Sequence, residues 1–181
     1  PDVIMIGEIR DRNTMKQAIA YAETGHLCLS TLHANNANQA MERVINFFPE
    51  EAHRQLLVDL SLNLAGGVSQ RLIPGLHEKL APAVEVMLNS SYISDLITKG
   101  EFSGIKEAMA RSTEIGMCTF DQALYQLYTE DRISLDEALH NADSRTDLAL
   151  RIRLAAGVST QDAGDLSIDT SSPIQSAARL A

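Results

Sequence analysis

Residues 1–11 read PDVIMIGEIRD, an apolar run that ends in charged residues. The part from Val3 to Ile6 is continuously apolar and is closed by Gly7, which is typical of a strand buried on both faces. A carboxylate, Glu8, follows at once. Because ligands of α/β proteins bind outside the carboxyl ends of parallel strands, Glu8 is a candidate site residue. The alternative is an ordinary solvated strand end.

The next segment has the pattern of a helix followed by a second strand. Apolar residues recur at helical spacing from residue 15 to residue 22, with Asn13 as a candidate N-cap and Gly25 at the expected C-terminal cap. Residues 26–32 are again mostly apolar. The order strand, helix, strand predicts a βαβ unit with parallel pairing and a right-handed crossover.

Two more helices and two more strands are expected before residue 90. Asn35 is a candidate cap for a helix that stops at Pro49, and a second helix follows directly. The runs 68–73 and 80–88 are strand-like. We expect them to form an antiparallel pair that extends the parallel sheet.

From residue 90 onward the pattern predicts short helices, at 91–98, 105–111, 119–128, 135–141 and 148–156. A capping box of Ser134 and Glu137 opens the fourth of these. The fold class is therefore α/β, a parallel sheet with helices over residues 1–89, followed by a small all-helical subdomain over residues 90–156. Residues 157–181 are rich in Ser and Thr and poor in large apolar side chains, so we expect a disordered tail.

The composition excludes some classes of function. The formal net charge is -9, aromatic residues make up 4% and Trp is absent, whereas nucleic-acid binding relies on clustered Lys and Arg and on aromatic stacking. No apolar run is long enough to span a membrane and no leader pattern opens the sequence, which predicts a cytoplasmic protein. Because Pro1 leads straight into a core strand, we expect the chain to be the later part of a longer protein.

Polar groups also follow the second strand. Thr31 and His33 share a strand face, so both could reach a ligand at the sheet edge that carries Glu8. A histidine there can donate a hydrogen bond to a terminal phosphate. The alternatives are a His33 that is simply hydrogen-bonded and a His26 that caps the preceding helix. Zinc is not favoured, because the His and Cys side chains of this stretch alternate faces and no suitably spaced fourth ligand lies nearby.

Several motifs together resemble the secretion ATPase superfamily, which comprises type II secretion, type IV pilus and related motors. Residues 1–11 are similar to its strand motif, in which Gly-Glu, an aliphatic residue and Arg-Asp follow an apolar run. Residues 24–35, TGHLCLSTLHAN, are similar to its His box. FFP at 47–49 and SQRL at 69–72 follow in the family's order. The resemblance covers residues 1–156.

Within the superfamily the chain looks most like the retraction branch, the PilT and PilU motors. It lacks the four-cysteine zinc module that assembly and type II secretion motors usually carry after the His box. Residues 92–97, YISDLI, keep the apolar positions of the branch's Ala-Ile-Arg-Asn-Leu-Ile motif but carry Ser and Asp in place of Arg and Asn. That departure and the run LHANNANQA at 32–40 favour the PilU type.

The resemblance implies the C-terminal part of a RecA-like P-loop ATPase domain that uses ATP and Mg²⁺. It makes Glu8 the Walker B acid, acting on the attacking water or on the magnesium shell through water, with no direct protein ligand to the metal. His33 would be the second catalytic residue. The nucleotide-binding residues would be Gly7, Thr31, His26 and Arg10.

Arginines are the usual fingers of ring ATPases, which makes several of them candidates for contacts to a phosphate in a neighbouring subunit. A surface ion pair is the alternative for each. The candidates are Arg10, Arg12, Arg43 and Arg71.

The resemblance also implies partners and a place in the cell. The expected partners are further copies in a homo-hexamer, a PilT-type retraction ATPase and an inner-membrane platform protein of the pilus, without nucleic acid. The protein would lie in the cytoplasm, peripheral at the inner membrane, and drive type IV pilus retraction and twitching motility. Because the sequence holds no Gly-x-x-x-x-Gly-Lys-[Ser/Thr] loop, we expect the chain alone to be inactive.

Two alternative functions stay open. One is a type II secretion or pilus-assembly ATPase. The other is a non-catalytic accessory module, in which residues 90–156 dock a partner retraction motor.

Overall fold

The computed structural model describes residues 1–155 and residue 157. Its first part is a βαβ unit of β1 (Val3–Glu8), α1 (Arg12–Glu23) and β2 (Leu27–Thr31). The two strands pair in parallel along their length, as predicted. The pairing shifts at Gly7, so that the last residue of β1, Glu8, lies opposite the last residue of β2, Thr31.

The start of α1 differs from the prediction. Its N-cap is Asp11, whose Oδ1 accepts a hydrogen bond from the Thr14 amide at 2.8 Å. The prediction of Asn13 was wrong because Asp11, two residues earlier, offers a charged acceptor to the free amides at the positive end of the helix. Gly25 follows the helix with a φ of 89°, a left-handed conformation that glycine adopts without steric cost.

Two helices, α2 (Ala37–Asn46) and α3 (Glu50–Asn63), follow β2. Asn36, not Asn35, caps α2, and its Oδ1 accepts a hydrogen bond from the Gln39 amide at 2.9 Å. Both asparagines have a suitable side chain, and only the one adjacent to the helix has its oxygen within reach of that amide.

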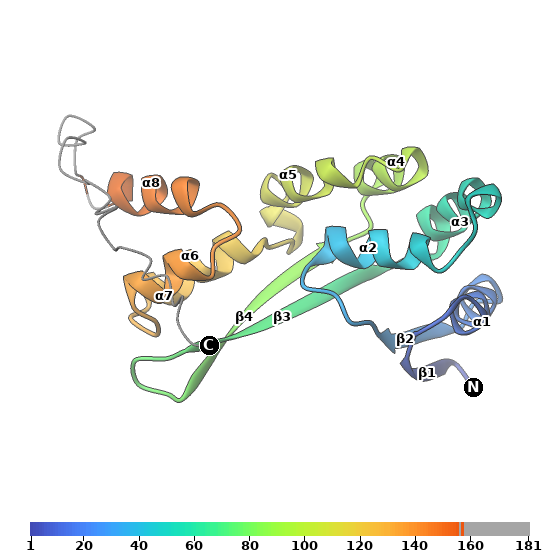
Figure 1. The fold of residues 1–181 in the computed structure, drawn as a ribbon, viewed down its shortest axis with the longest axis horizontal. Helices are drawn as coiled ribbons and strands as arrows, with labels where there is room; N and C mark the ends of the chain where they lie inside the picture. The colour runs from blue at the N-terminus through green and yellow to red at the C-terminus, as the bar shows by residue number, and fades with distance from the viewer. Residues whose placement is uncertain (156, 158–181) are drawn as a thin grey trace, which may run out of the picture.

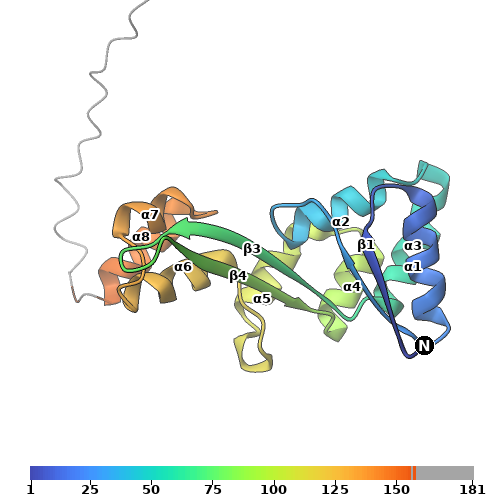
Figure 2. The ribbon, with the colours of Figure 1, turned by 90° about the horizontal axis from the view of Figure 1, so that it is seen from below.

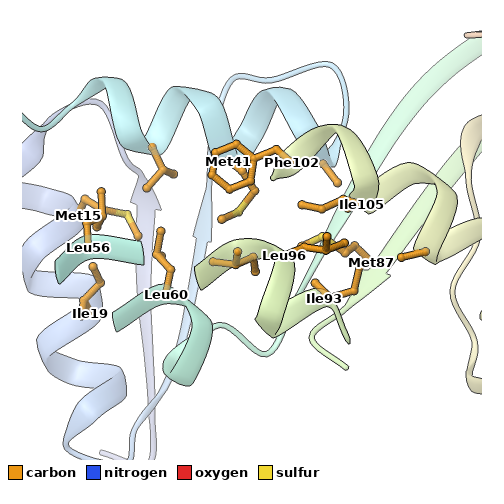
Figure 3. Packing of buried hydrophobic residues seen from close by; sticks show 14 of the residues in the cluster. Met15, Ile19, Met41, Leu56, Leu60, Met87, Ile93, Leu96, Phe102 and Ile105 are labelled. Carbon is orange, nitrogen blue, oxygen red and sulfur yellow. The ribbon is translucent and has the colours of Figure 1, made fainter. Parts of the chain in front are cut away.

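The first core cluster joins α1, α2 and α3 to α4 (Ser91–Lys99), to α5 (Ile105–Ala110) and to the short 3₁₀ turn η1 (Phe102–Gly104). Figure 3 shows side chains from these elements pointing toward one another, with Met87 of a later strand among them. The removal of this apolar surface from water is the main force that holds these helices together.

A long hairpin of β3 (Gly66–Pro74) and β4 (Leu80–Leu88) runs along the molecule. Its strands are antiparallel, as predicted. The prediction that it extends the parallel sheet was wrong within the described residues, where β1–β2 and β3–β4 are separate two-stranded sheets. A mostly apolar cavity lies between β2 and β3. Figure 1 shows α2, α4, α5 and α6 on one side of the hairpin.

The C-terminal helices lie beside the far end of the hairpin, and together with it they form the second core cluster (Figure 2). At its centre lies Phe120, which is fully buried and packs with Ile73, Ala81 and Ala83 of the hairpin. The 3₁₀ turn η2 (Thr113–Ile115) precedes these helices. They are α6 (Phe120–Thr129), α7 (Leu135–His140) and α8 (Arg145–Ala155).

The two clusters describe packing and do not test how the chain divides into domains. Helices α4 and α5 contribute to the first cluster together with α1 to α3. The division into residues 1–89 and 90–156 therefore stays a prediction. Apart from Gly157, the expected disordered tail lies outside the described residues. Among the helices that the structure describes, none has the length and apolar character needed to cross a membrane.

Candidate functional site

The carboxyl ends of β1 and β2 bring Glu8 and Thr31 to one edge of the parallel sheet. The Thr31 hydroxyl donates a hydrogen bond of 2.6 Å to the carbonyl oxygen of Gly7. The Ile9 amide donates another, of 2.9 Å, to the carbonyl oxygen of Thr31. These bonds fix the bulge at Gly7, and with it the direction in which the Glu8 side chain leaves the strand.

The Glu8 carboxylate contacts two side chains, one arginine and one histidine. Its Oε2 accepts a hydrogen bond of 2.7 Å from Nε of Arg10 and lies 2.6 Å from Nη2 of the same ion-paired guanidinium. Its Oε1 lies 3.0 Å from Nε2 of His33. Arg10 and His33 are 76% and 77% exposed, against 21% for Glu8. The carboxylate is thus the fixed centre of the site, and two exposed side chains surround it.

The electrostatics keep Glu8 ionised. The hydrogen bond from Arg10 is the largest cause of a lowered pKa of Glu8, and it outweighs the opposing effect of burial. The charges of Arg10, His33 and Arg43 act in the same direction. An ionised carboxylate next to an imidazole can accept a proton or a hydrogen bond from a water molecule that the imidazole also contacts.

Five of the six predicted site residues therefore meet at one edge of the sheet, namely Gly7, Glu8, Arg10, Thr31 and His33. His26 does not join them. It precedes β2, whose first amide, that of Leu27, bonds to the Asp2 carbonyl at the other end of the sheet.

The His26 ring closes the end of α1. Its Nδ1 lies 2.9 Å from the Thr24 hydroxyl and 3.2 Å from the Tyr21 carbonyl oxygen. This geometry favours the alternative given above, a histidine that caps the preceding helix. A role of His26 in nucleotide binding stays a prediction.

The other candidate arginines have different surroundings. Arg12 lies over the ring of Phe48, 5.7 Å from its centroid. Arg43 acts on Glu8 only through its charge. Arg71 points to the C-terminal helices, where it forms an ion pair of 2.8 Å with Asp143.

The sequence reasoning missed a buried carboxylate, Glu85. It is 3% exposed, and its Oε1 accepts a hydrogen bond of 2.7 Å from the Ala37 amide at the start of α2. Burial is the largest cause of a raised pKa of Glu85. A signal was available, because Glu85 occupies the same strand phase as the buried residues Ala83 and Met87 of β4.

The side chains around Glu8 suit a ligand whose phosphates already carry a bound metal ion. In the part of the chain that the structure describes, no three His, Cys, Asp or Glu side chains gather as metal ligands do. One carboxylate, one imidazole and one hydroxyl can instead contact the water shell of a phosphate-bound Mg²⁺ or the phosphate itself. The predicted pair of ATP and Mg²⁺ fits these residues in that sense.

A cavity of about 630 Å³ lies beside this edge, between the two sheets. Residues 28–31 of β2 and the following residue, Leu32, line one side, and residues 66–70 of β3 line the other. Side chains of α1, α2 and α3 cover it. Two strand edges thus face each other across an apolar space.

Comparison with known proteins supports the sequence resemblance. The family model described as type II/IV secretion system protein matches residues 1–153. The type IV pilus ATPase PilU of Pseudomonas aeruginosa is 58% identical over 168 residues, which are 92% of this chain and 43% of that protein. The type IV pilus retraction ATPase PilT of the same organism is 34% identical over 142 residues, 78% of this chain and 41% of that protein.

A solved structure agrees with the fold. The crystal structure of the pilus retraction motor PilT with bound ADP superposes with a TM-score of 0.74 at 33% identity, over 83% of this chain and 42% of that one. The predicted fold class, a parallel sheet with helices as in these ATPases, is confirmed. The chain spans less than half the length of these relatives.

Proposed function

Because the chain belongs to the family of type II/IV secretion system proteins and is PilU-like, we propose that it is the C-terminal portion of an ATP-hydrolysing motor subunit for type IV pilus retraction. The names of its relatives support this choice, since they include a type IV pilus ATPase, a retraction ATPase and a twitching motility protein. ATP is the proposed substrate, in line with the ADP bound to the PilT motor.

One observation carries the proposal, the contact of 3.0 Å between Glu8 Oε1 and His33 Nε2 at the carboxyl edge of β1 and β2. Glu8 stays ionised and holds the attacking water through a hydrogen bond to its carboxylate. His33 donates a hydrogen bond to the terminal phosphate. The magnesium ion of the bound nucleotide supplies charge neutralisation, and the protein contributes mainly position and electrostatics to such a transfer.

The phosphates of ATP also need a phosphate-binding loop, which the residues around Glu8 do not form. We place this loop in the part of the intact subunit outside this chain. The cavity between β2 and β3 supports this view. A strand from that part would pair with both open edges and cover side chains that are now exposed, such as Leu29 (47%) and Val68 (73%). If this strand runs parallel to β2, its carboxyl end lies beside Glu8 and Thr31, where a phosphate-binding loop is needed.

The proposed assembly is a hexamer with nucleotide sites between subunits. The exposure of Arg10 supports it, because a side chain that is 76% exposed can exchange its contact with Glu8 for one with a phosphate of the neighbouring subunit. We place the assembly in the cytoplasm at the pilus machinery of the inner membrane, with a PilT-type ATPase and the platform protein as partners.

Pilus retraction in cells tests the proposal. A strain without the gene receives the intact gene, the Glu8→Gln variant or the Glu114→Gln variant. Glu114 lies exposed in η2, so its variant repeats the chemical change away from the site. The intact gene and Glu114→Gln should restore retraction, and Glu8→Gln should not. Normal retraction without the gene, together with a defect in protein secretion, would favour a secretion motor instead.

A further inference from the structure

The buried carboxylate Glu85 holds the start of α2 from a distant strand. Its Oε1 accepts a hydrogen bond of 2.7 Å from the amide of Ala37, the first residue of that helix. The first amides of a helix have no partner within the helix, so an external acceptor stabilises them. The side chain of Asn36 accepts a hydrogen bond from another of these amides, that of Gln39. Glu85 therefore fixes the point at which α2 begins.

This point is one end of the segment that carries His33. Residues 32–36 connect β2 to α2, and both ends of this segment are tied to other elements. At the first end, the hydroxyl of Thr31 bonds to Gly7 at 2.6 Å. At the second end, Glu85 bonds to Ala37. The position of His33 between the two anchors depends on both.

Arg71 contacts the same segment near its second end. Its Nη2 donates a weak hydrogen bond of 3.4 Å to the carbonyl oxygen of Asn35. The same guanidinium bonds to the carbonyl oxygen of Asn141 at 3.0 Å and to Asp143 at 2.8 Å, and it lies 3.9 Å from the centroid of the Phe120 ring. One side chain thus connects the His33 segment to the C-terminal helices.

The C-terminal side of this connection is itself well anchored. Asp121 of α6 accepts a hydrogen bond of 2.7 Å from the Asp143 amide. Lys106 of α5 contacts both carboxylates, at 2.8 Å and 3.3 Å. A shift of α6 or of the loop between α7 and α8 would therefore displace the Arg71 side chain.

We propose that Glu85 and Arg71 are positioning residues, which hold His33 against Glu8 and let the C-terminal helices regulate the hydrolytic site. This inference rests on the proposed function. It assigns a role to groups that the proposed chemistry does not use, because neither residue contacts Glu8 or His33 directly.

Steady-state kinetics of the intact subunit test the role of Glu85. Glu85→Leu removes the acceptor, and Glu85→Gln keeps an oxygen at the same place. Because small displacements of a catalytic group cost up to about 100-fold in rate, we expect Glu85→Leu to lower kcat by about 10-fold to 100-fold with KM for ATP nearly unchanged. Glu85→Gln should restore most of kcat. A kcat for Glu85→Leu equal to that of the wild type would overturn the proposal.

Arg71 provides a second variant in case Glu85→Leu fails to fold. Arg71→Gln should also lower kcat, whereas Arg132→Gln should not. Arg132 is a matched control, because its ion pair of 2.6 Å with Glu78 also joins the hairpin to the C-terminal part but does not touch residues 32–36. Equal kcat values for the two arginine variants would contradict the inference.

A spectroscopic measurement separates this inference from the proposed function. In the 181-residue chain, Glu8→Gln should move the imidazole ¹⁵N signals of His33. In an Arg71→Gln or Glu85→Leu background the same substitution should move them much less, because His33 no longer lies against Glu8. An unchanged response would overturn the positioning role even where the subunit hydrolyses ATP. The opposite pair of results would refute the proposed function alone. In that case the His33 signals lose their response in the Arg71→Gln or Glu85→Leu background, but the intact subunit with Glu8→Gln still hydrolyses ATP.

Discussion

The imidazole Nε2 of His33 lies 3.0 Å from Oε1 of Glu8, although a helix and a strand separate the two residues along the chain. The parallel pairing of β1 and β2 produces this contact, because it places the carboxyl ends of both strands at one edge. Arg10 binds the other oxygen of the same carboxylate. The acid, the imidazole and the guanidinium thus form one site.

The pKa of Glu8 should rise when Arg10 is removed. The hydrogen bond from Arg10 is the largest cause of its lowered value, so Arg10→Gln should bring the pKa back toward the ordinary range of a glutamate. The change is read from the ¹³C signal of the Glu8 carboxyl during a pH titration of the 181-residue chain. A titration midpoint that does not move would show that Arg10 does not hold the carboxylate in solution.

His33 should matter for turnover more than other histidines. Since a positioned hydrogen-bonding group contributes about 100-fold or more to such reactions, His33→Ala should reduce kcat of the intact subunit by about that factor. His77 lies exposed in the turn of the hairpin and provides the control, since His77→Ala should leave kcat unchanged. Equal kcat values for His33→Ala and His77→Ala would show that His33 does not act in hydrolysis.

Local patterns were sufficient to predict most elements. The apolar run before Gly7 and the helical spacing after it predict the βαβ unit, and with it the meeting of Glu8 and His33. Within single elements the errors concern the ends of helices. Ser134 caps α7 through the Glu137 amide, but the Glu137 carboxylate bonds to Asn141 instead of closing the predicted box.

Contacts between distant residues could not be predicted in this way. The bond between Glu85 and Ala37 and the four partners of Arg71 depend on how the hairpin packs against α2 and α6.

The start of α8 was also missed, because the charged residues Arg145 and Asp147 of its first turn carry no apolar pattern. Ser144 nevertheless caps that helix, through the amide of Asp147.

The stability of the chain should depend on pH through Glu85. Its pKa is raised in the folded state mainly by burial, with Asp143 acting in the same sense, whereas the hydrogen bonds with the Ala37 amide and Ser69 and the charge of Arg71 act against it. The resulting stabilisation is complete below the ordinary value of 4.5 and is lost as pH rises through the folded pKa.

Glu85→Gln removes this dependence, because the amide does not titrate. Relative to this variant, the wild type should lose about 1.4 kcal/mol of unfolding free energy per unit of pKa difference as pH rises. Urea unfolding of both chains between pH 4 and pH 8 measures this. A difference that stays constant with pH, or that grows in the opposite sense, would contradict a raised pKa.

The capping box of α6 should contribute measurably to stability. Thr119 accepts a hydrogen bond from the Gln122 amide at 3.3 Å, and Gln122 accepts one from the Thr119 amide at 2.9 Å. Thr119→Ala should lower the free energy of unfolding by about 1 kcal/mol. Thr119→Ser should retain most of it, and Thr113→Ala, at an exposed position, serves as the control. An equal effect of both alanine variants would show that the cap adds nothing.

The most direct test of the central claim is the rate of ATP hydrolysis by the intact subunit carrying Glu8→Gln. Nucleotide affinity is measured on the same preparation. If Glu8 acts on the attacking water, turnover should fall by about 100-fold or more while ATP binding is spared. Hydrolysis at a rate near that of the wild type, with ATP bound normally, would show that Glu8 does not have this role.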